Sequence, residues 1–395
     1  MNILYVIPFF KPYEVGGAEI STYLYAKGLN KEHRIVVLTP NYKKFSDETR
    51  LENKKFLIHR FAFPLKPKRI MVFFDSCIFQ LCLFLQVIVA IKKFKIDIIH
   101  IQSSSMIPGP FFAGRLSGKK VVVTIRDHGY KFSKKSLMDE LKKLCGIRKT
   151  LEPWIAVMVY INRHLRKFCI QRMDRIIAVS NYMKDCVAKK LDIENERIKV
   201  SYMVKPDWSK GQMARNGSKK YRLLFLGRLD KAKGIELLLR AFALVKQKNI
   251  ELLIAGNSNV GYYKKFVKTF GIENVTFLGK IPHEKTKSIY EKADAAVVPS
   301  LRDEPLSRVL IEAGCLGKPI IATDRGGSSE VVINKKTGVL IKDISPKGFS
   351  NGIEYVIKNP RKAKEMGRNM KKLANSLFDP QKNLKIISKI YRELL

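Results

Sequence analysis

The chain has 395 residues, of which 46% are apolar and 10% aromatic, and its 75 lysines and arginines against 35 acidic residues give a formal net charge of +40. This apolar content excludes a disordered polyelectrolyte, and at about 150 residues per domain the length allows two or three domains with their own cores. The excess of positive charge favours an anionic partner, such as nucleic acid, a phosphorylated substrate or an anionic membrane. A solvated basic surface without a partner is the alternative.

The cysteines and the N-terminal residues give no sign of secretion or of a metal site. The six cysteines form no C-x-x-C pair and show no Cys/His spacing that suits zinc, so we expect neither a disulfide nor a bound metal. Residues 1–10 are apolar but lack a basic segment before them and a cleavage-like site after them, which favours a first strand over a signal peptide. We therefore expect a cytoplasmic protein.

Short β-branched runs alternate with helical patterns along the chain. Such a pattern is typical of parallel sheets covered by helices on both faces, and it predicts an α/β fold with doubly wound sheets. A strand, helix, strand pattern beginning at Asp97 is echoed by one beginning at Asp294, as expected for two halves built on one plan. The predicted strands are residues 3–7, 34–38, 96–101, 120–125, 175–179, 222–226, 251–255, 275–278, 295–299 and 318–323.

One apolar segment, residues 76–91, lies between the basic segments 66–69 and 92–95. A helix that spans a bilayer needs about 20 residues, and this run is shorter and contains two glutamines. Two interpretations stay open. The segment is either the buried helix before the strand 96–101 or an interfacial helix whose basic flanks meet lipid headgroups.

Composition changes mark the expected domain boundaries. We predict an N-terminal domain at 1–204, a polar linker with Gly and Pro at 205–220, and a C-terminal domain at 221–378. Residues 379–395 have apolar side chains at helical spacing and predict an amphipathic helix packed on one of the domains.

Two cations follow the predicted strand 222–226. Arg228 and Lys233 lie in the loop that leads into a predicted helix at 235–245, where free N–H groups and the helix dipole favour an anion. This arrangement suits a diphosphate, although it is neither a Walker A nor a G-x-G-x-x-G motif. The alternative is a turn with two solvated cations.

Two acidic side chains follow the strand 295–299. Glu304 lies in the loop and Glu312 in the next helix, with seven residues between them. A loop carboxylate suits sugar hydroxyls or a developing positive centre, and a carboxylate on the helix suits a ribose diol. After the next strand, Gly326 and Gly327 would let the backbone approach a ligand closely.

These motifs together resemble the retaining nucleotide-sugar glycosyltransferases of family 4. The matching residues occur in the expected order over nearly the whole chain, and they are Gly16-Gly17-Ala18-Glu19, Gly227-Arg228 with Lys233-Gly234, Glu304-x7-Glu312, and Gly326-Gly327 ahead of Glu330. The resemblance implies the GT-B fold, in which two Rossmann-like domains face each other across a cleft and the C-terminal domain holds the donor nucleotide.

Roles for the charged residues follow from the resemblance. Arg228 and Lys233 would hold the diphosphate, Glu304 the donor sugar and Glu312 the ribose. The family transfers its sugar by front-face departure and attack, in which a donor phosphate oxygen accepts the proton of the acceptor. We therefore interpret Glu304 as an electrostatic and positioning group rather than as one of the paired carboxylates of a hydrolase.

Backbone groups and small residues have implied roles as well. The backbone at Leu306 and Ser307 would meet sugar hydroxyls, and the loop that contains Pro282 would lie near the nucleobase. Five glycines complete the implied donor contacts. Gly16 and Gly17 of the N-terminal domain would close over the diphosphate, and Gly227, Gly326 and Gly327 follow predicted strands of the C-terminal domain.

The strand 120–125 runs into Arg126-Asp127-His128. Relatives often have His-Asp or Arg-Asp there on the acceptor side, so Asp127 is the candidate for positioning the acceptor hydroxyl. The alternative is an Asp that caps the following helix. We expect His100, at the end of a strand, to be a packed or surface histidine.

The resemblance implies a retaining hexosyltransferase with an N-terminal acceptor-binding domain and a C-terminal nucleotide-sugar-binding domain. Its donor would be a UDP- or GDP-sugar with no required cofactor or metal, and its acceptor would be lipid-linked or a polysaccharide. The basic charge and the apolar segment 76–91 with its basic flanks lead us to expect peripheral association with an anionic membrane, at its cytoplasmic face. Two departures stand out: residues 200–207 lack the common Asn-Gly, and Pro305-Leu306-Ser307 replaces a frequent Gly-Phe-Gly. The alternatives are a same-fold nucleotide-sugar epimerase or hydrolase and a basic nucleic-acid-binding protein. No recognised nucleic-acid-binding motif supports the last, so we expect no nucleic-acid partner.

Overall fold

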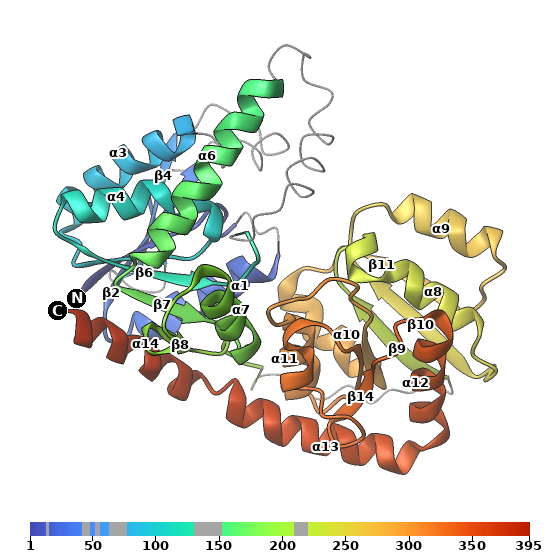
Figure 1. The fold of residues 1–395 in the computed structure, drawn as a ribbon. Coiled ribbons are helices and arrows are strands. Elements are labelled where there is room, and N and C mark those ends of the chain that lie inside the picture. Colours follow the sequence, from blue (N-terminus) through green and yellow to red (C-terminus); the bar gives the residue numbers. More distant parts are fainter. Residues whose placement is uncertain (13–15, 42–47, 52–55, 63–76, 130–151, 209–219) are drawn as a thin grey trace. The chain divides into compact units, whose positions relative to one another are not determined.

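The computed structural model describes residues 1–12, 16–41, 48–51, 56–62, 77–129, 152–208 and 220–395 (Figure 1). The chain divides into two compact units: unit 1 is residues 1–204 together with 380–395, and unit 2 is residues 205–379. Of the predicted linker, 205–208 packs on unit 2 through hydrogen bonds of Lys205 to Phe378 and of Lys287 to Trp208. Residues 209–219 of the linker lie outside the described residues.

Unit 1 is built on an eight-stranded sheet in the order β3-β4-β2-β1-β5-β6-β7-β8. The pairing of β3 with β4 is antiparallel, and the other pairings described in this sheet are parallel. β1 lies between β2 and β5, so the direction of winding reverses there. The strands are β1 (Asn2–Val6), β2 (Arg34–Asn41), β3 (Glu48–Leu51), β4 (Phe56–Ala62), β5 (Ile98–Ile101), β6 (Lys120–Ile125), β7 (Arg175–Ala178) and β8 (Ile198–Val200).

Helices cover both faces of this sheet because its apolar side chains alternate in direction. Leu4 and Val6 belong to one core cluster, with side chains of α3, α4, α6 and α7. Ile3 and Tyr5 belong to another, with side chains of α1 and α14. The helices of unit 1 are α1 (Gly17–Leu29), α3 (Cys77–Phe94), α4 (Pro108–Leu116), α6 (Glu152–Gln171), α7 (Asn181–Leu191) and α14 (Pro380–Leu394).

The C-terminal helix α14 packs on unit 1 through both apolar and polar contacts. Tyr391 is fully buried, and its hydroxyl lies 2.5 Å from His100 Nδ1 and 3.1 Å from the Tyr5 hydroxyl. His100 Nε2 lies 2.7 Å from Thr124 Oγ1, so this buried network joins α14 to β1, β5 and β6. Burial lowers the pKa of His100 well below its usual value. His100 is thus a packed histidine.

Unit 2 is built on a six-stranded parallel sheet in the order β11-β10-β9-β12-β13-β14. The chain winds outward from β9 to β11 and returns with β12 on the other side of β9. Ligands of such sheets bind beyond the carboxyl ends of the strands at this reversal. The strands are β9 (Tyr221–Leu226), β10 (Ile250–Ala255), β11 (Val275–Gly279), β12 (Ala295–Val298), β13 (Ile320–Thr323) and β14 (Gly338–Ile341).

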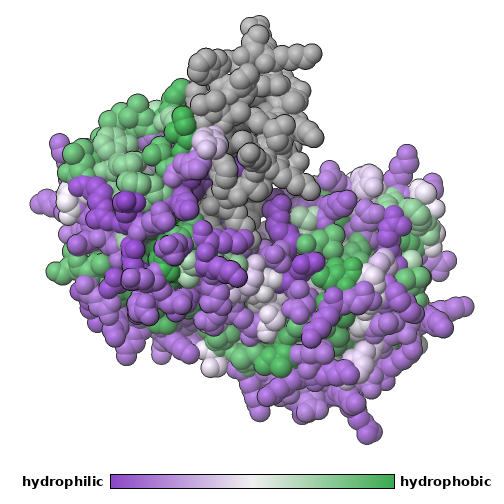
Figure 2. Space-filling view, in the orientation of Figure 1, coloured by the Kyte–Doolittle hydropathy of each residue, from purple (hydrophilic) through white to green (hydrophobic). Residues whose placement is uncertain are grey.

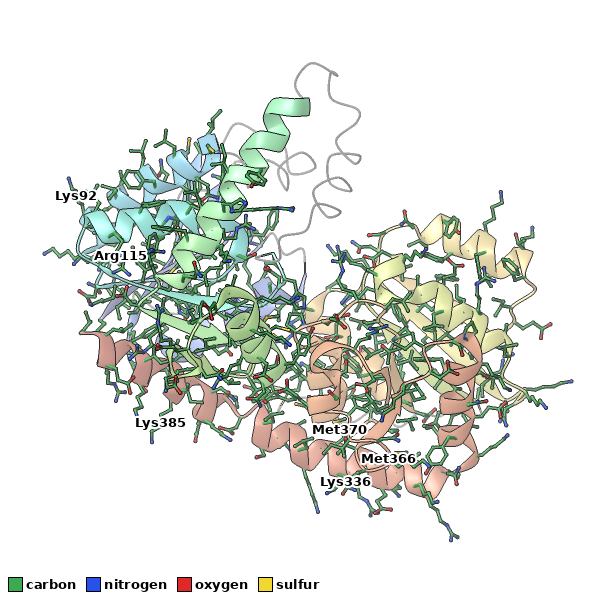
Figure 3. The ribbon with its side chains drawn as sticks, in the orientation of Figure 1. Lys92, Arg115, Lys336, Met366, Met370 and Lys385 are labelled. Atoms are coloured by element: carbon green, nitrogen blue, oxygen red, sulfur yellow. The ribbon has the colours of Figure 1, made fainter. Side chains whose placement is uncertain are left out.

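The helices of unit 2 pack tightly where small residues face them. A Cβ atom on Gly314 of α11 would lie 3.2 Å from the sulfur of Met370, which α13 directs at it (Figure 3). The helices are α8 (Ile235–Ala243), α9 (Val260–Thr269), α10 (Thr286–Lys292), α11 (Arg308–Cys315), α12 (Pro346–Lys358) and α13 (Pro360–Leu377).

The parallel sheets of both units confirm the predicted α/β fold class. Each of the ten predicted strands is present, and four further strands, β3, β4, β8 and β14, were not predicted. The apolar segment 76–91 forms most of α3. One face of this helix is buried in the core, and the other contributes to an apolar area of the surface (Figure 2).

Candidate functional site

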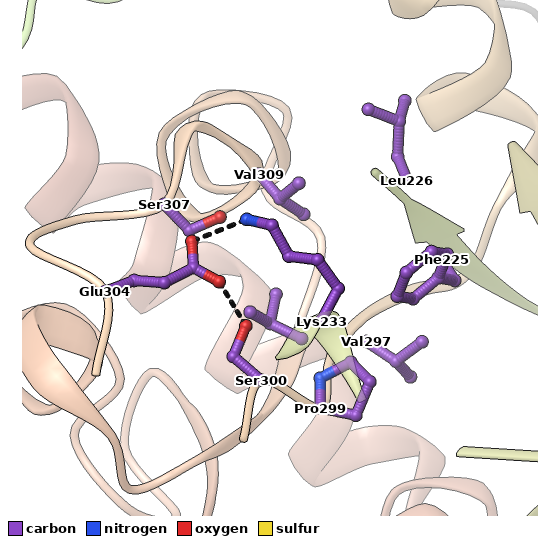
Figure 4. Close-up of a pocket in the computed structure, with 10 residues that line it drawn as sticks. Phe225, Leu226, Lys233, Val297, Pro299, Ser300, Glu304, Ser307 and Val309 are labelled. Carbon is purple, nitrogen blue, oxygen red and sulfur yellow. Dashed lines mark hydrogen bonds and ion pairs between the residues drawn. The ribbon is translucent and has the colours of Figure 1, made fainter. Parts of the chain in front are cut away.

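A small hollow lies beyond the carboxyl ends of β9 and β12, at the point where the winding of unit 2 reverses (Figure 4). Three polar residues of the two loops, Lys233, Ser300 and Glu304, face one another there over an apolar floor. The lining residues are Phe225, Leu226, Lys233, Val297, Val298, Pro299, Ser300, Glu304, Ser307 and Val309. The structure therefore brings Lys233, Glu304 and Ser307 of the predicted site together.

Glu304 is held by two donors in this hollow. Lys233 Nζ donates to Glu304 Oε2 at 2.8 Å, and the Ser300 hydroxyl donates to Glu304 Oε1. The Glu304 side chain is largely shielded, with 16% of it exposed, whereas 29% of the Lys233 side chain is exposed. Both oxygens of Glu304 thus accept a hydrogen bond, and Lys233 retains donors that a ligand can use.

Two glycines allow these loops to approach each other. Gly234 has φ +72°, and a Cβ atom on it would lie 1.8 Å from the carbonyl oxygen of Pro299. Gly326 has φ +60°, and its Cβ would lie 2.0 Å from the carbonyl oxygen of Glu304. Gly327 then donates its N–H to that same Glu304 carbonyl at 2.8 Å. The Gly326-Gly327 turn therefore fixes the backbone that carries Glu304.

Arg228 lies in the loop that carries Lys233 but does not line the hollow. Its side chain is 56% exposed, and its Nη2 lies 3.4 Å from Asp230 Oδ2. Asp230 also accepts the backbone N–H of Lys233 at 2.9 Å, which fixes the turn. Gly227, at the start of the loop, donates to the Ala255 carbonyl at 3.0 Å. Arg228 is thus a solvent-facing cation at the end of β9.

Glu312 lies inside α11 within a polar cluster of its own. It is 3% exposed, and it accepts from Arg308 Nε at 3.0 Å and from the Tyr290 hydroxyl at 3.1 Å. His283 Nε2 lies 3.4 Å from Glu312 Oε1. Burial acts to raise the pKa of Glu312, but the neighbouring His283 and Arg308 outweigh it and lower the pKa below its usual value. The carboxylate is therefore stabilised in its charged form.

The remaining predicted donor residues surround these two acids. Leu306 and Ser307 are buried in the turn between Glu304 and α11, and Ser307 is the residue before the first turn of that helix. Pro282 directly precedes His283, so its loop lies next to Glu312. The predicted sugar, ribose and base contacts thus occupy one edge of the unit 2 sheet.

In unit 1, Gly16 and Gly17 lie at the N-terminus of α1. Gly16 is the residue before the helix, and its N–H donates to Glu19 Oε2 at 2.8 Å. Glu19 is buried, and its carboxylate caps the N-terminus of α1 by accepting the Gly16 N–H. The first turn of an α-helix leaves further N–H groups without an intrahelical acceptor, which favours an anion.

Asp127 follows β6 in unit 1 and is held by one of its two oxygens. Asp127 Oδ1 accepts from the Ser104 hydroxyl at 2.5 Å and from the Gly129 N–H at 2.7 Å. Within the described part of the chain Oδ2 has no hydrogen-bond partner, so it can accept one from a ligand. The helix that Asp127 might have capped would fall in 130–151, outside the described residues.

The preceding residue, Arg126, was not predicted as a site residue. Its Nη1 donates to Thr22 Oγ1 of α1 at 2.8 Å and to the Gln102 carbonyl at 3.3 Å, whereas Nε and Nη2 are buried without a partner among the described residues. The amide of Gln102, which follows β5, is likewise buried and unpaired. Burial lowers the pKa of Arg126. Polar groups left unpaired at the strand ends of unit 1 indicate a place where water or a ligand binds.

Sequence reasoning also missed the residues that hold the acids. Arg308 precedes Glu312 by one helical turn, and Ser300 lies two residues after β12 and four residues before Glu304, so both spacings were visible in the sequence. Tyr290 approaches Glu312 from α10, and no local sequence pattern predicts this contact. Among the described residues, no group of three or more His, Cys, Asp or Glu side chains is arranged to hold a metal ion.

Two family models match the chain. The model of glycosyltransferase family 4 covers residues 15–203, and that of the glycosyl transferases of group 1 covers residues 210–373. The glycosyltransferase MJ1069 of Methanocaldococcus jannaschii is 26% identical over 99% of this chain and 98% of its own length. The D-rhamnosyltransferase WbpZ of Pseudomonas aeruginosa is 28% identical over 56% of this chain and 60% of its own length.

Solved structures of low sequence identity share the fold. HepE of Anabaena, solved in complex with UDP-glucose, superposes with a TM-score of 0.75 at 20% identity over the whole of both chains. WaaG, a glycosyltransferase involved in lipopolysaccharide biosynthesis, superposes with a TM-score of 0.70 at 15% identity over 98% of this chain and 99% of its own.

Proposed function

Because this chain belongs to the group 1 glycosyltransferases and has the GT-B fold, we propose that it moves a hexose from a UDP- or GDP-sugar, with retention, to a lipid-linked or polysaccharide acceptor. The observation that carries the proposal is the pairing of Lys233 with Glu304 at the reversal point of the unit 2 sheet. There a cation adjoins the N-terminus of α8, and a fixed carboxylate stands beside it.

The negative charge that the leaving diphosphate gains during transfer accounts for the presence of Lys233 and Arg228 in this loop. The bond between the sugar C1 and the diphosphate oxygen breaks, and the nucleoside diphosphate gains negative charge as it leaves. Lys233 and the N–H groups at the start of α8 stabilise that charge, and the exposed Arg228 side chain reaches it from the same loop. The acceptor oxygen bonds to C1 on the face that the diphosphate leaves, and a phosphate oxygen takes the acceptor's proton.

Glu304 acts by position and charge in this scheme. Its two oxygens accept from Lys233 and Ser300, and the Gly326-Gly327 turn fixes its backbone. A carboxylate held in this way is a poor nucleophile, but it can orient sugar hydroxyls and stabilise positive charge at C1. Glu312 takes the ribose hydroxyls, and Pro282 lies against the base.

Unit 1 supplies the acceptor contacts. Asp127 Oδ2 accepts the hydrogen bond of the acceptor hydroxyl, because Oδ1 is already used by Ser104 and Gly129. The N–H groups of Gly17 and its neighbours at the start of α1 contribute to the diphosphate. The high positive charge of the chain suits an acceptor on an anionic membrane, so the enzyme works at the cytoplasmic face.

A panel of ligands tests the donor. UDP, GDP, ADP and their sugars are compared for thermal stabilisation of the protein, since a ligand raises apparent stability by mass action. We expect stabilisation by one of UDP or GDP and by its sugar. EDTA is added in parallel, and we expect the stabilisation and the transfer to persist, whereas their loss would contradict the metal-free scheme.

Product analysis separates transfer from its alternatives. With the stabilising sugar and membrane extract as acceptor source, we expect a glycoconjugate whose new linkage has the anomeric configuration of the donor. Free sugar as the sole product would indicate a hydrolase, and an isomerised donor an epimerase. Inversion at C1 would overturn the retaining step.

A further inference from the structure

Exposed apolar side chains of unit 1 gather on three helices. Within the described part of the unit, each large apolar side chain that is at least about a third exposed lies on α3, α4 or α6, apart from Leu395 at the chain end. We call this surface the three-helix face. Its members are Ile78, Leu81, Leu85 and Val89 of α3, Phe112 and Leu116 of α4, and Tyr160, Ile161 and Phe168 of α6.

α3 is apolar on two opposite sides. Phe79, Leu83 and Val87 are fully buried in the core against the sheet. The outer residues, at intervals of three and four positions, form a continuous stripe on which Leu81 is 60% and Leu85 53% exposed. The outer side of a surface helix in a soluble protein normally carries polar residues, so this apolar stripe indicates an interaction surface.

α4 packs closely beside α3 and extends the apolar stripe. A Cβ atom on Gly109 would lie 2.5 Å from the Gln80 carbonyl, and the Gln80 side chain bonds both to the Gly109 N–H and to the Ser105 carbonyl. Leu116, on the outer side of α4, is 74% exposed. Figure 2 shows the resulting apolar area over α3 and α4.

Basic side chains predominate around the three-helix face, where Asp174, which follows α6, pairs with Arg115 at 3.4 Å. α3 and α4 contain no Asp or Glu, and α6 contains Glu152 alone, at its first residue. Lys92 and Arg115, both exposed, project from the ends of α3 and α4 (Figure 3). Arg172, just after α6, lies with its guanidinium 3.9 Å from the ring of Phe168. Cations that border an apolar stripe fit an anionic lipid surface.

We propose that the three-helix face docks on an anionic bilayer, with α3 lying in the plane of the interface. α3 is long and apolar enough to cross a membrane, but 39% of it is buried inside the unit. A spanning orientation would pull Phe79, Leu83 and Val87 out of the core, whereas in-plane docking buries the outer stripe and leaves the core intact. The inference deepens the membrane-facing part of the proposed function and rests on it.

Vesicle flotation tests the docking. The full chain is mixed with phosphatidylcholine vesicles with and without phosphatidylglycerol, and we expect it to float with the anionic vesicles and to dissociate in high salt. Joint substitution Leu81→Asp with Leu85→Asp should lower the bound fraction about tenfold or more. The matched control, Leu244→Asp with Phe270→Asp on exposed sites of unit 2, should float like the parent.

Several outcomes would overturn the inference. A parent protein that stays in the soluble fraction, or a Leu81/Leu85 variant that floats normally, would refute the face. Self-association that the same variant abolishes would assign the face to a second copy of the chain. Thermal stabilisation by the nucleotide is measured on each variant, so flotation without nucleotide binding would sink the proposed function and leave the docking face standing.

Depth measurement tests the in-plane orientation. In a Leu85→Trp variant, the added fluorescence should be quenched more by lipids brominated near the headgroup end of the acyl chain than by lipids brominated at its far end. The parent protein corrects for Trp154 and Trp208. Strongest quenching at the far end would indicate a spanning α3 and overturn the proposed orientation.

Discussion

Replacing Lys233 by Met removes a charge from the proposed donor site while keeping an unbranched side chain. In the structure Lys233 Nζ donates to Glu304 at 2.8 Å and keeps 29% of its side chain exposed. If Lys233 meets the leaving diphosphate, its loss removes one charged donor from a group that gains charge in the transition state. We therefore expect Lys233→Met to abolish most of the transfer and to weaken the stabilisation by nucleotide.

The expected magnitudes differ for catalysis and for folding. Loss of one preorganised donor to a developing oxyanion costs about 2.7–4 kcal/mol, or a factor of about 10²–10³ in kcat. The ion pair with Glu304 is partly exposed, so its contribution to folding is about 1 kcal/mol or less, and Ser300 still donates to the carboxylate. The variant should therefore remain folded, with its melting temperature within a few degrees of the parent's.

The assay combines turnover, nucleotide-induced stabilisation and a matched control. Lys231 lies in the same short turn and is exposed, so Lys231→Met changes the net charge equally without touching the hollow, and it should keep near-parental turnover. Glu304→Gln and the double variant complete a cycle. If Lys233 acts on the donor itself, the double variant should be slower than Glu304→Gln.

Two results would refute this reasoning. Near-parental turnover of Lys233→Met would remove Lys233 from the site. A double variant as active as Glu304→Gln alone would mean that Lys233 serves to orient Glu304 and has no part of its own in neutralising the diphosphate.

Three further substitutions test other parts of the structure. Gly234→Ala, at φ +72° with its Cβ 1.8 Å from a carbonyl oxygen, should lower the free energy of unfolding by more than about 2 kcal/mol in chemical denaturation. The control Gly261→Ala, with no atom within 4 Å of its Cβ, should leave the free energy of unfolding unchanged or raise it by up to about 1 kcal/mol. Equal effects of the two substitutions would contradict the proposed steric role of Gly234. Arg126→Met should lower transfer about tenfold without changing stabilisation by nucleotide, and unchanged kcat/KM would remove Arg126 from the acceptor side. Because burial lowers the pKa of His100, the unfolded chain binds a proton first, and stability should fall as the pH drops below about 6.5, by up to about 1.4 kcal/mol per pH unit. Melting curves of His100→Gln should show a shallower pH slope, and an unchanged slope would exclude His100 as its source.

The sequence predicted most strands that are continuous apolar runs, because burial on both faces of a parallel sheet leaves that pattern, but it missed the four-residue run of β14. It missed β4, where His59 and Arg60 interrupt the run, and β8, which has three residues. Strands this short or interrupted form through pairing with neighbours, as β4 does with β2 over seven residue pairs. The pairing is set by tertiary structure and leaves no local signal.

The residues of the candidate site also divide into those that a local sequence pattern predicts and those that only the tertiary structure reveals. Residues carried by motifs, such as Lys233, Glu304 and Glu312, were predicted, because strand ends and helix starts can be located in a sequence. The groups that hold them were missed. Tyr290 reaches Glu312 from another helix, and Arg126 could be named but its burial could not be foreseen.

Each unit places a cation beyond the carboxyl ends of its strands, but the surroundings of the two cations differ. Lys233 is paired with a carboxylate, so in the proposed function a diphosphate would share it with Glu304, the residue proposed to contact the sugar. Arg126 has hydroxyl and carbonyl partners at Nη1, and its other nitrogens are unpaired within the described residues. In the proposed function, Lys233 would return to Glu304 when the product leaves. Arg126 lies near the Tyr25 ring and interacts with the charges of Glu19 and Asp127 through space, and it would keep its unpaired nitrogens for a group that binds beside Asp127. This asymmetry suits a donor product that must leave after each transfer and an acceptor that has to be held until its hydroxyl reacts.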